Sequence, residues 1–180
     1  MKAFTKLLSV VTLGVLLSCN SEPSLQKYFV ENSDNPKFVN VDIAKSSLNF
    51  SEEKLTSEEL AAIETVKKLN VIAYQVDPNK ANEYIAEQAK VKSILSDAKY
   101  QELMKMGEGE SGITVRYVGT DELIDEVVVF ASDEKKGFVV ARIIGEDMTP
   151  TSLMTLVQAM QHSKIDMSKL KQFESFMNTK

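Results

Sequence analysis

Few side chains in this sequence have the type and spacing that chemistry requires, and Cys19 is the first of them. It is the only cysteine among the 180 residues, and it follows Leu16, Leu17 and Ser18. A lone thiol excludes intrachain disulfides and cysteine metal sites, which need further cysteines. Covalent modification of the sulfur is the chemistry that remains, with a free or buried thiol as the alternative.

The residues before Cys19 are organised as a secretory signal peptide. A basic start with two lysines precedes Leu7–Leu17, an apolar core well short of the roughly 20 residues that span a bilayer. The end of this core resembles the lipobox of bacterial lipoproteins, which implies cleavage before Cys19, lipid on its sulfur and an acylated amino terminus. Two or more acyl chains anchor a protein stably. We therefore predict a signal peptide over residues 1–18, a lipidated tether over residues 19–24, and attachment to the bacterial cell envelope at the outer membrane or periplasmic face.

A second candidate is a group of six carboxylates. If the last three predicted strands form a meander, the turn before the second strand and the end of the third lie at one edge of the sheet. Carboxylates in number are what Ca²⁺ requires, at oxygen distances of about 2.3–2.6 Å. The spacing matches no calcium loop, however, and neighbouring strand residues point to opposite faces, which also argues against an acid/base pair. Solvated hairpin ends, with one acid capping the next helix, are the favoured interpretation. The group comprises Asp121, Glu122, Asp125, Glu126, Glu146 and Asp147.

Two further features are weaker candidates. The loop Gly107–Gly112 has the glycine spacing of a dinucleotide-binding motif, but it is predicted to follow a helix and open a strand, the reverse of that motif's context. Glu108 and Glu110 also occupy the place of a pyrophosphate, so we interpret the loop as flexible and acidic. His162, the only histidine, has no local nucleophile or carboxylate partner and is expected at a helix end, favourable with the helix dipole. Core filling is the favoured role of the late methionines, with a methionine-rich copper or peptide surface as the alternative; they stand at positions 148, 154, 160, 167 and 177.

Composition narrows the possible functions. Without residues 1–18 the mature chain has 162 residues, with 19 basic and 26 acidic side chains and a formal charge of −7. That charge disfavours nucleic acids and anionic membrane surfaces as partners. The length suits one domain with its own core, and no later segment is long and apolar enough for a membrane span.

Caps and apolar periodicity predict the elements that position these residues. The capping box Thr56–Glu59 begins a helix whose apolar spacing continues to Leu69. Asp77–Pro78 begins a helical stretch towards Met106, which Ser96–Asp97 can divide. The fold class is α+β, a single domain over residues 25–180 with an antiparallel or mixed sheet of about four to five strands packed by helices. The remaining predicted elements are helices at 25–30, after Thr149–Pro150 and at 168–177, and strands at 38–43, 70–76, 113–117, 127–131 and 138–144.

Five stretches of the chain, taken together, form a familiar pattern. They are Leu25–Val30 (LQKYFV), Lys68–Val71 (KLNV), Lys99–Met104 (KYQELM), Ile124–Phe130 (IDEVVVF) and Gly137–Pro150 (GFVVARIIGEDMTP). In these stretches the chain resembles the bacterial domain of unknown function 4252 family, whose members are predicted lipoproteins. The resemblance extends over nearly all of the mature chain. It implies an envelope lipoprotein with one compact domain, and it implies no activity, substrate or catalytic residue.

These observations favour a membrane-anchored, non-enzymatic module that binds another envelope protein or senses envelope state. Cys19 is the one assigned site, a lipidation site through which the bilayer is a partner. No catalytic, cofactor-binding or metal-binding residue is assigned, and nucleic acid is not expected. The alternative is a small-ligand or cation-binding module with a pocket between sheet and helices. A hydrolase with an unrecognised site assembled from distant residues is the second alternative.

Overall fold

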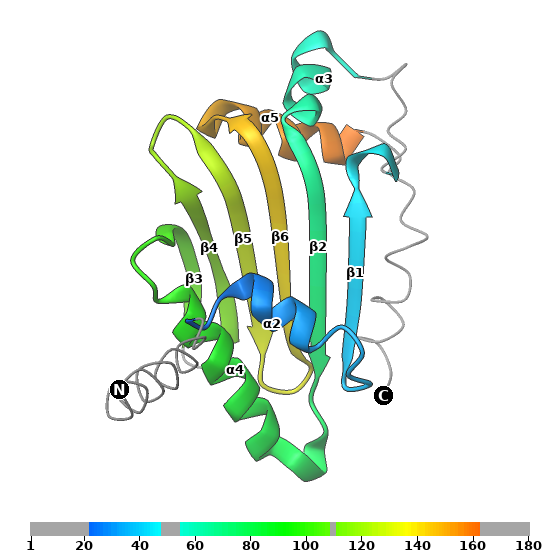
Figure 1. Cartoon of the computed structure of the whole chain (residues 1–180), viewed down its shortest axis with the longest axis vertical. Coiled ribbons are helices and arrows are strands. Elements are labelled where there is room, and N and C mark those ends of the chain that lie inside the picture. The colour runs from blue at the N-terminus through cyan, green and yellow to red at the C-terminus, as the bar shows by residue number, and fades with distance from the viewer. Residues whose placement is uncertain (1–21, 48–54, 109–110, 163–180) are drawn as a thin grey trace, which may run out of the picture.

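The computed structural model describes residues 22–47, 55–108 and 111–162, which form one six-stranded sheet with four α-helices (Figure 1). All neighbouring strands are antiparallel, in the order β1-β2-β6-β5-β4-β3. The predicted single α+β domain is confirmed, with six strands instead of four to five. The strands are β1 (Phe38–Ala44), β2 (Val66–Gln75), β3 (Gln101–Glu108), β4 (Ser111–Gly119), β5 (Ile124–Asp133) and β6 (Gly137–Met148). The helices are α2 (Leu25–Glu31), α3 (Ser57–Glu64), α4 (Ala81–Leu95) and α5 (Pro150–His162), with short 3₁₀ turns at Lys45–Ser47 and Pro78–Lys80.

Strand β3 is the element that sequence reasoning assigned wrongly, as a continuation of a helix towards Met106. Helix α4 ends at Leu95, and the Ser96 N–H donates back to the Lys92 carbonyl at 3.0 Å. Most residues of β3 are good helix formers, so local propensity favours a helix there. The pairing of β3 with β4 overrides that propensity.

The predicted helix through Leu69 is also too long, for a related reason. Helix α3 ends at Glu64, and β2 begins at Val66. From Lys68 onward β2 pairs with β1 on one side and β6 on the other, so its backbone hydrogen bonds are made within the sheet. The periodicity after residue 64 therefore belongs to a strand buried between two neighbours.

Helices α2 and α4 cover one face of the sheet, called here the front face (Figure 1). The main core lies between them and the sheet. Its centre is aromatic: the rings of Tyr74 and Phe138 stack at 5.5 Å, and Phe38 meets Tyr74 edge-on at 5.1 Å. Tyr84 and Val91 of α4 are buried against this group. Each large apolar side chain buried in this way contributes about 1.5–3 kcal/mol to folding.

Helices α3 and α5 pack against each other near one end of the sheet, where α5 contacts the opposite, back face. Ala62 and Ile63 of α3 meet Leu156 and Ala159 of α5, with Ile143 of β6 packed against the same cluster. Ile143 has the opposite strand parity from Phe138 and Val140, which places it on the back face. The two helix pairs therefore build separate cores, α2 and α4 on the front face and α3 with α5 near one end of the sheet.

The predicted starts of these two helices are confirmed. The Thr56 hydroxyl accepts the Glu59 N–H at 3.2 Å and the Glu59 carboxylate accepts the Thr56 N–H at 2.8 Å, a complete capping box. Helix α5 begins at Pro150, and the Thr149 hydroxyl accepts the Ser152 N–H at 3.0 Å. The predicted helix at 168–177 lies outside the described residues.

Candidate functional site

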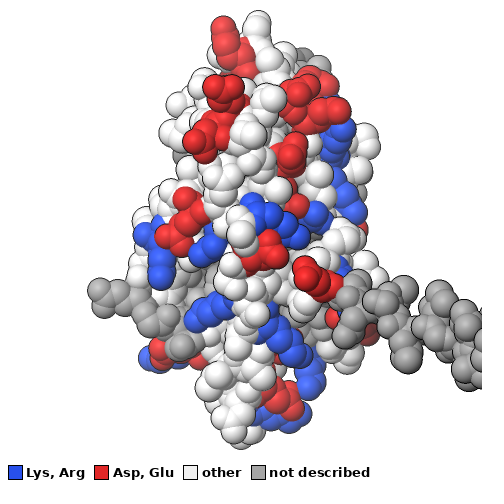
Figure 2. Space-filling view, turned by 60° about the vertical axis from the view of Figure 1, so that its left-hand side comes forward, with Lys and Arg blue, Asp and Glu red and all other residues white. Residues whose placement is uncertain are grey.

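A cavity of about 480 Å³ lies between the second half of α4 and the front face of β3, β4 and β5. We call it the α4 groove. Three basic side chains from three elements line it, Lys92 of α4, Lys105 of β3 and Arg116 of β4. This concentration of basic residues is unexpected in an acidic chain. Figure 2 shows Lys and Arg across the middle and lower part of this side of the molecule, interspersed there with Asp and Glu, while the top carries mainly Asp and Glu.

Strand register brings the groove residues together. Arg116 stands opposite Glu102, and Thr114 stands opposite Lys105. Glu102 and Lys105 are three positions apart, so regular alternation would place them on opposite faces of the sheet. A register shift between Glu102 and Met104 adds one residue to β3 and turns both charged side chains towards the groove. The irregularity in β3 therefore creates the charge arrangement of the site.

Arg116 is the fixed member of the basic set. Its Nη1 donates to the carbonyls of Leu95, at 2.8 Å, and Tyr100, at 3.2 Å. Its Nη2 lies 3.0 Å from Glu102 Oε2. The Leu95 carbonyl is one of the groups that the end of α4 leaves without an intrahelical partner, so the guanidinium also caps that helix. Arg116 joins β4, β3 and α4 at one end of the groove.

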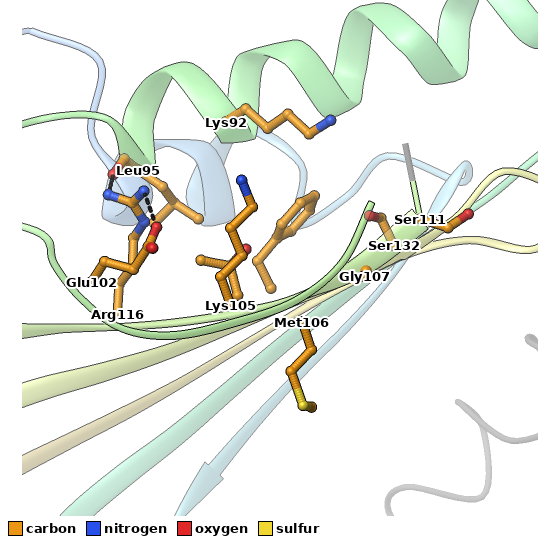
Figure 3. Close-up of a pocket in the computed structure, with 12 residues that line it drawn as sticks. Lys92, Leu95, Glu102, Lys105, Met106, Gly107, Ser111, Arg116 and Ser132 are labelled. Atoms are coloured by element: carbon orange, nitrogen blue, oxygen red, sulfur yellow. Dashed lines mark hydrogen bonds and ion pairs between the residues drawn. The ribbon is translucent and has the colours of Figure 1, made fainter. Parts of the chain in front are cut away.

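The two lysines face the open part of the groove. Figure 3 shows the Lys105 side chain rising from β3 towards α4, where Lys92 extends above it, while Met106 points away through the sheet. Lys92 donates to Gln88 Oε1 at 3.1 Å. None of the ion pairs within the described residues involves Lys105. Each ammonium group carries N–H donors that an anion bound in the cavity can accept.

The rest of the lining supplies hydroxyl groups and an apolar wall. Ser111, Thr114 and Ser132 bring side-chain hydroxyls, which donate to or accept from a ligand oxygen. Leu95 and Phe130 are 4% and 5% exposed and form the apolar part. A site with cations, hydroxyls and a small apolar surface can hold an anionic group that carries carbon atoms.

The loop Gly107–Gly112 borders this groove, and its context differs from the prediction. It connects β3 to β4 as a hairpin, so it follows a strand where a helix was expected. It still opens a strand instead of a helix, which leaves it without the helix N-terminus of a dinucleotide-binding motif. Residues 109–110 lie outside the described part.

The six predicted carboxylates do not form one site. The topology on which they depended is confirmed, because Ile124 after the β4–β5 turn pairs with Met148 at the end of β6. Their side chains nevertheless separate: Asp121 accepts from the Tyr117 hydroxyl at 2.5 Å, and Glu146 pairs with Lys67 at 2.6 Å. The remaining four are Glu126, which is buried beside Arg142, and the exposed Glu122, Asp125 and Asp147. Across residues 22–47, 55–108 and 111–162, no three or more His, Cys, Asp or Glu side chains are placed to hold a metal ion.

Two further sequence features fall at the limits of the structure. His162 lies in α5, at the last residue that the structure describes. Cys19 and the predicted signal peptide lie outside the described residues. Within the part described, none of the helices has the length and apolar character to cross a membrane.

Sequence reasoning missed all three basic residues of the α4 groove. Lys105 was assigned to a helix, and that assignment gave no reason to expect it near Arg116. Lys92 has the sequence context of an ordinary exposed lysine on a helix. No local motif connects the three, since their convergence depends on the β3–β4 pairing and on the extra residue of β3. If residues 101–108 had been predicted as a strand paired with β4, Lys105 and Arg116 would have been expected on neighbouring strands.

Fold and site together define a class: an α+β domain whose antiparallel sheet holds a basic groove under a helix. The chain belongs to the family described as domain of unknown function (DUF4252), whose profile matches residues 28–156. The predicted family is therefore confirmed, and the match runs from α2 to α5 with all six strands and the whole groove inside it. No match was found among the curated proteins or among the solved structures compared with the chain.

Proposed function

We propose that this domain binds a small anionic ligand in the α4 groove without converting it, while lipid on Cys19 holds the chain at a membrane of the bacterial envelope. One observation carries the proposal: Lys92, Lys105 and Arg116, from three separate elements, converge on one cavity of about 480 Å³. A ligand anion there gains charge-assisted hydrogen bonds, which are roughly twice as strong as neutral ones.

The groove suits binding better than catalysis. General acid–base chemistry most often uses a histidine or a carboxylate that is free to exchange a proton with the ligand. Glu102 is the one carboxylate among the described lining residues, and it is already paired with Arg116. The lysines and hydroxyls that remain recognise an anion, which supports the ligand-binding alternative over the hydrolase.

The anchor is supported by the sequence features before residue 19. A short apolar core, a lipobox-like end and a single cysteine agree with one another, and the resemblance to a family of predicted lipoproteins points the same way. Mass measurement of the protein isolated from bacterial membranes tests this part. Loss of residues 1–18 together with added acyl mass is expected, and an unmodified Cys19 would refute it.

Thermal unfolding with a panel of anions tests the groove. Phosphate, sulfate, acetate and glycerol phosphate are compared with chloride at equal ionic strength, so that screening is constant. A ligand at about 100 times its Kd adds about 2.7 kcal/mol to stability, enough to raise the midpoint by several degrees. The effect is expected to disappear in Lys105→Gln and to persist in Lys136→Gln, an exposed lysine in the β5–β6 turn. Equal shifts in both variants would place binding elsewhere.

A second candidate function is docking of an envelope protein with an apolar surface, the hypothesis that the sequence alone favoured. Met104, Met106 and Ile113 are 43%, 51% and 36% exposed and lie beside one another on β3 and β4. Methionine adapts its shape to a partner surface. Crosslinking in intact cells, followed by recovery of a tagged chain beside a Cys19→Ala control, tests it. Met106→Lys is expected to remove the crosslink and Lys105→Gln to leave it unchanged; an unaffected crosslink in Met106→Lys contradicts this candidate.

A further inference from the structure

We infer that the anion bound in the α4 groove is the phosphate headgroup of a lipid in the membrane that holds the chain, an inference that rests on the proposed function. The groove lies across one helix, α4, from the place where the chain enters the fold. Lipid headgroups and soluble phosphates share the same chemistry, and the geometry of the anchor favours the lipid.

The chain enters the fold directly beside α4. Pro23 and Ser24, just before α2, line a second cavity of about 470 Å³ between α2 and α4, opposite Ala89 and Ile94. Leu95, the neighbour of Ile94, lines the α4 groove. The same turn of one helix therefore borders both the entry of the chain and the basic groove. A helix with its side chains is only about 10–12 Å across.

The predicted tether is too short to move the groove away from the membrane. Cys19 and Ser24 are five residues apart. Five residues span at most about 18 Å even when fully extended. With lipid on Cys19, Ser24 must remain within that distance of the headgroup layer, and α4 with it. The groove then lies within about 30 Å of the headgroup layer, which raises the effective concentration of lipid phosphate around it.

Local charge at this site opposes the net charge of the chain. Beside the chain entry, Lys27 pairs with Glu31 and Lys90 pairs with Glu87, so these lysines are largely compensated. In the α4 groove, Lys105 stands with Lys92 and Arg116 around one cavity, and Arg116 is paired with Glu102.

Asp121 and Glu122 belong to the turn between β4 and β5, which follows the far end of β4 and lies at the upper end of these strands in Figure 1. Charges separated by more than about 8 Å are largely screened at physiological ionic strength. A chain with a formal charge of −7 therefore still places three basic side chains, Lys92, Lys105 and Arg116, around one cavity.

The shape and lining of the groove also suit a headgroup. Lys105 and Lys92 face the position of a phosphate, and Thr114 lies directly opposite Lys105 on β4. Leu95 and Phe130 supply an apolar wall for the carbon atoms next to the phosphate. A bare inorganic anion makes no use of that wall, whereas a glycerol phosphate group does.

Lysine labelling in a bilayer tests the inference. The full lipidated protein is placed in nanodiscs of phosphatidylcholine alone or with added phosphatidylglycerol, and acylation by an amine-reactive reagent is followed by mass spectrometry. Lys105 is expected to be labelled several-fold more slowly in the anionic discs, with Lys136 labelled equally in both. In neutral discs, soluble glycerol phosphate is expected to protect Lys105 as well.

The outcomes separate the two proposals. Protection by glycerol phosphate without protection by phosphatidylglycerol overturns the lipid inference and leaves the proposed function standing. Protection by neither overturns both. Thr114→Phe fills the groove while keeping every charge, so it must abolish protection by the anionic lipid. The unfolding midpoint of Thr114→Phe first shows that the variant folds. If the anionic lipid still protects Lys105 in this variant, the lipid is attracted to the protein surface outside the groove, and the inference fails.

Discussion

Arg142 Nη2 lies 2.6 Å from Glu126 Oε2, and the two side chains are only 14% and 11% exposed. The same guanidinium donates to Gln26 of α2 at 2.6 Å, so this ion pair connects β5, β6 and the helix above them. Burial and the nearby Glu126 charge raise the pKa of Tyr100 to about 12. Each of the two charges depends on the other, because neither has ready access to water.

Replacing Glu126 with Gln is expected to destabilise the fold by about 3 kcal/mol, because it leaves the Arg142 charge buried without its partner. Urea unfolding gives the free energy directly. Glu146→Gln breaks the exposed Lys67 pair and is the matched control, with an expected loss below about 0.5 kcal/mol. The double variant Glu126→Leu with Arg142→Met is expected to recover most of the loss. If the double variant has a lower free energy of unfolding than Glu126→Gln alone, the charges themselves stabilise the core.

Local signals predicted the parts of the fold that local chemistry decides. The capping box at Thr56 and Glu59 and the helix start at Thr149–Pro150 depend on a few neighbouring residues, and both are confirmed. Strand β3 depends on a partner strand, and its helix-forming composition concealed it. The α4 groove was missed with it, since an extra residue in β3 brings Lys105 to the face of Arg116. Such a bulge follows from strand pairing and has no signature in the spacing of side chains.

Glu102→Gln is expected to tighten anion binding in the α4 groove. The change removes the one described carboxylate of the lining and frees Arg116 Nη2 from its 3.0 Å ion pair. Removing a unit charge about 5 Å from the ligand changes the binding free energy by about 1 kcal/mol in a solvated site. This corresponds to a change in Kd of about fivefold. Isothermal titration with glycerol phosphate measures it. Weaker binding in Glu102→Gln would mean that the carboxylate positions Arg116 for the ligand.

Asp133 is expected to make part of the stability depend on pH. Its carboxylate accepts the N–H groups of Lys135 and Lys136, at 2.9 and 3.0 Å, and these bonds lower its pKa in the folded state. A lowered pKa stabilises the fold above the unfolded value of about 3.9, and this contribution is lost as pH falls through the folded value. Asp133→Asn should therefore be less stable than the wild type at pH 7, with the difference vanishing at low pH. Glu134→Gln, an exposed change in the same turn, is the control, and a constant difference at all pH values would contradict the assignment.

Gly137 is the position where the β5–β6 hairpin tolerates no side chain. Its φ is +128°, and a Cβ there would lie 1.9 Å from the Tyr74 carbonyl oxygen. Gly137 also pairs with Gln75 of β2, so the hairpin cannot shift without disturbing a central strand. Gly137→Ala is expected to cost about 3 kcal/mol, from backbone strain and the displacement of β2. Lys136→Ala alters the same turn without either effect and should stay within about 0.5 kcal/mol of the wild type. Denaturant midpoints compare the two, and equal midpoints would show that the turn relaxes freely, leaving the Tyr74–Phe138 core undisturbed.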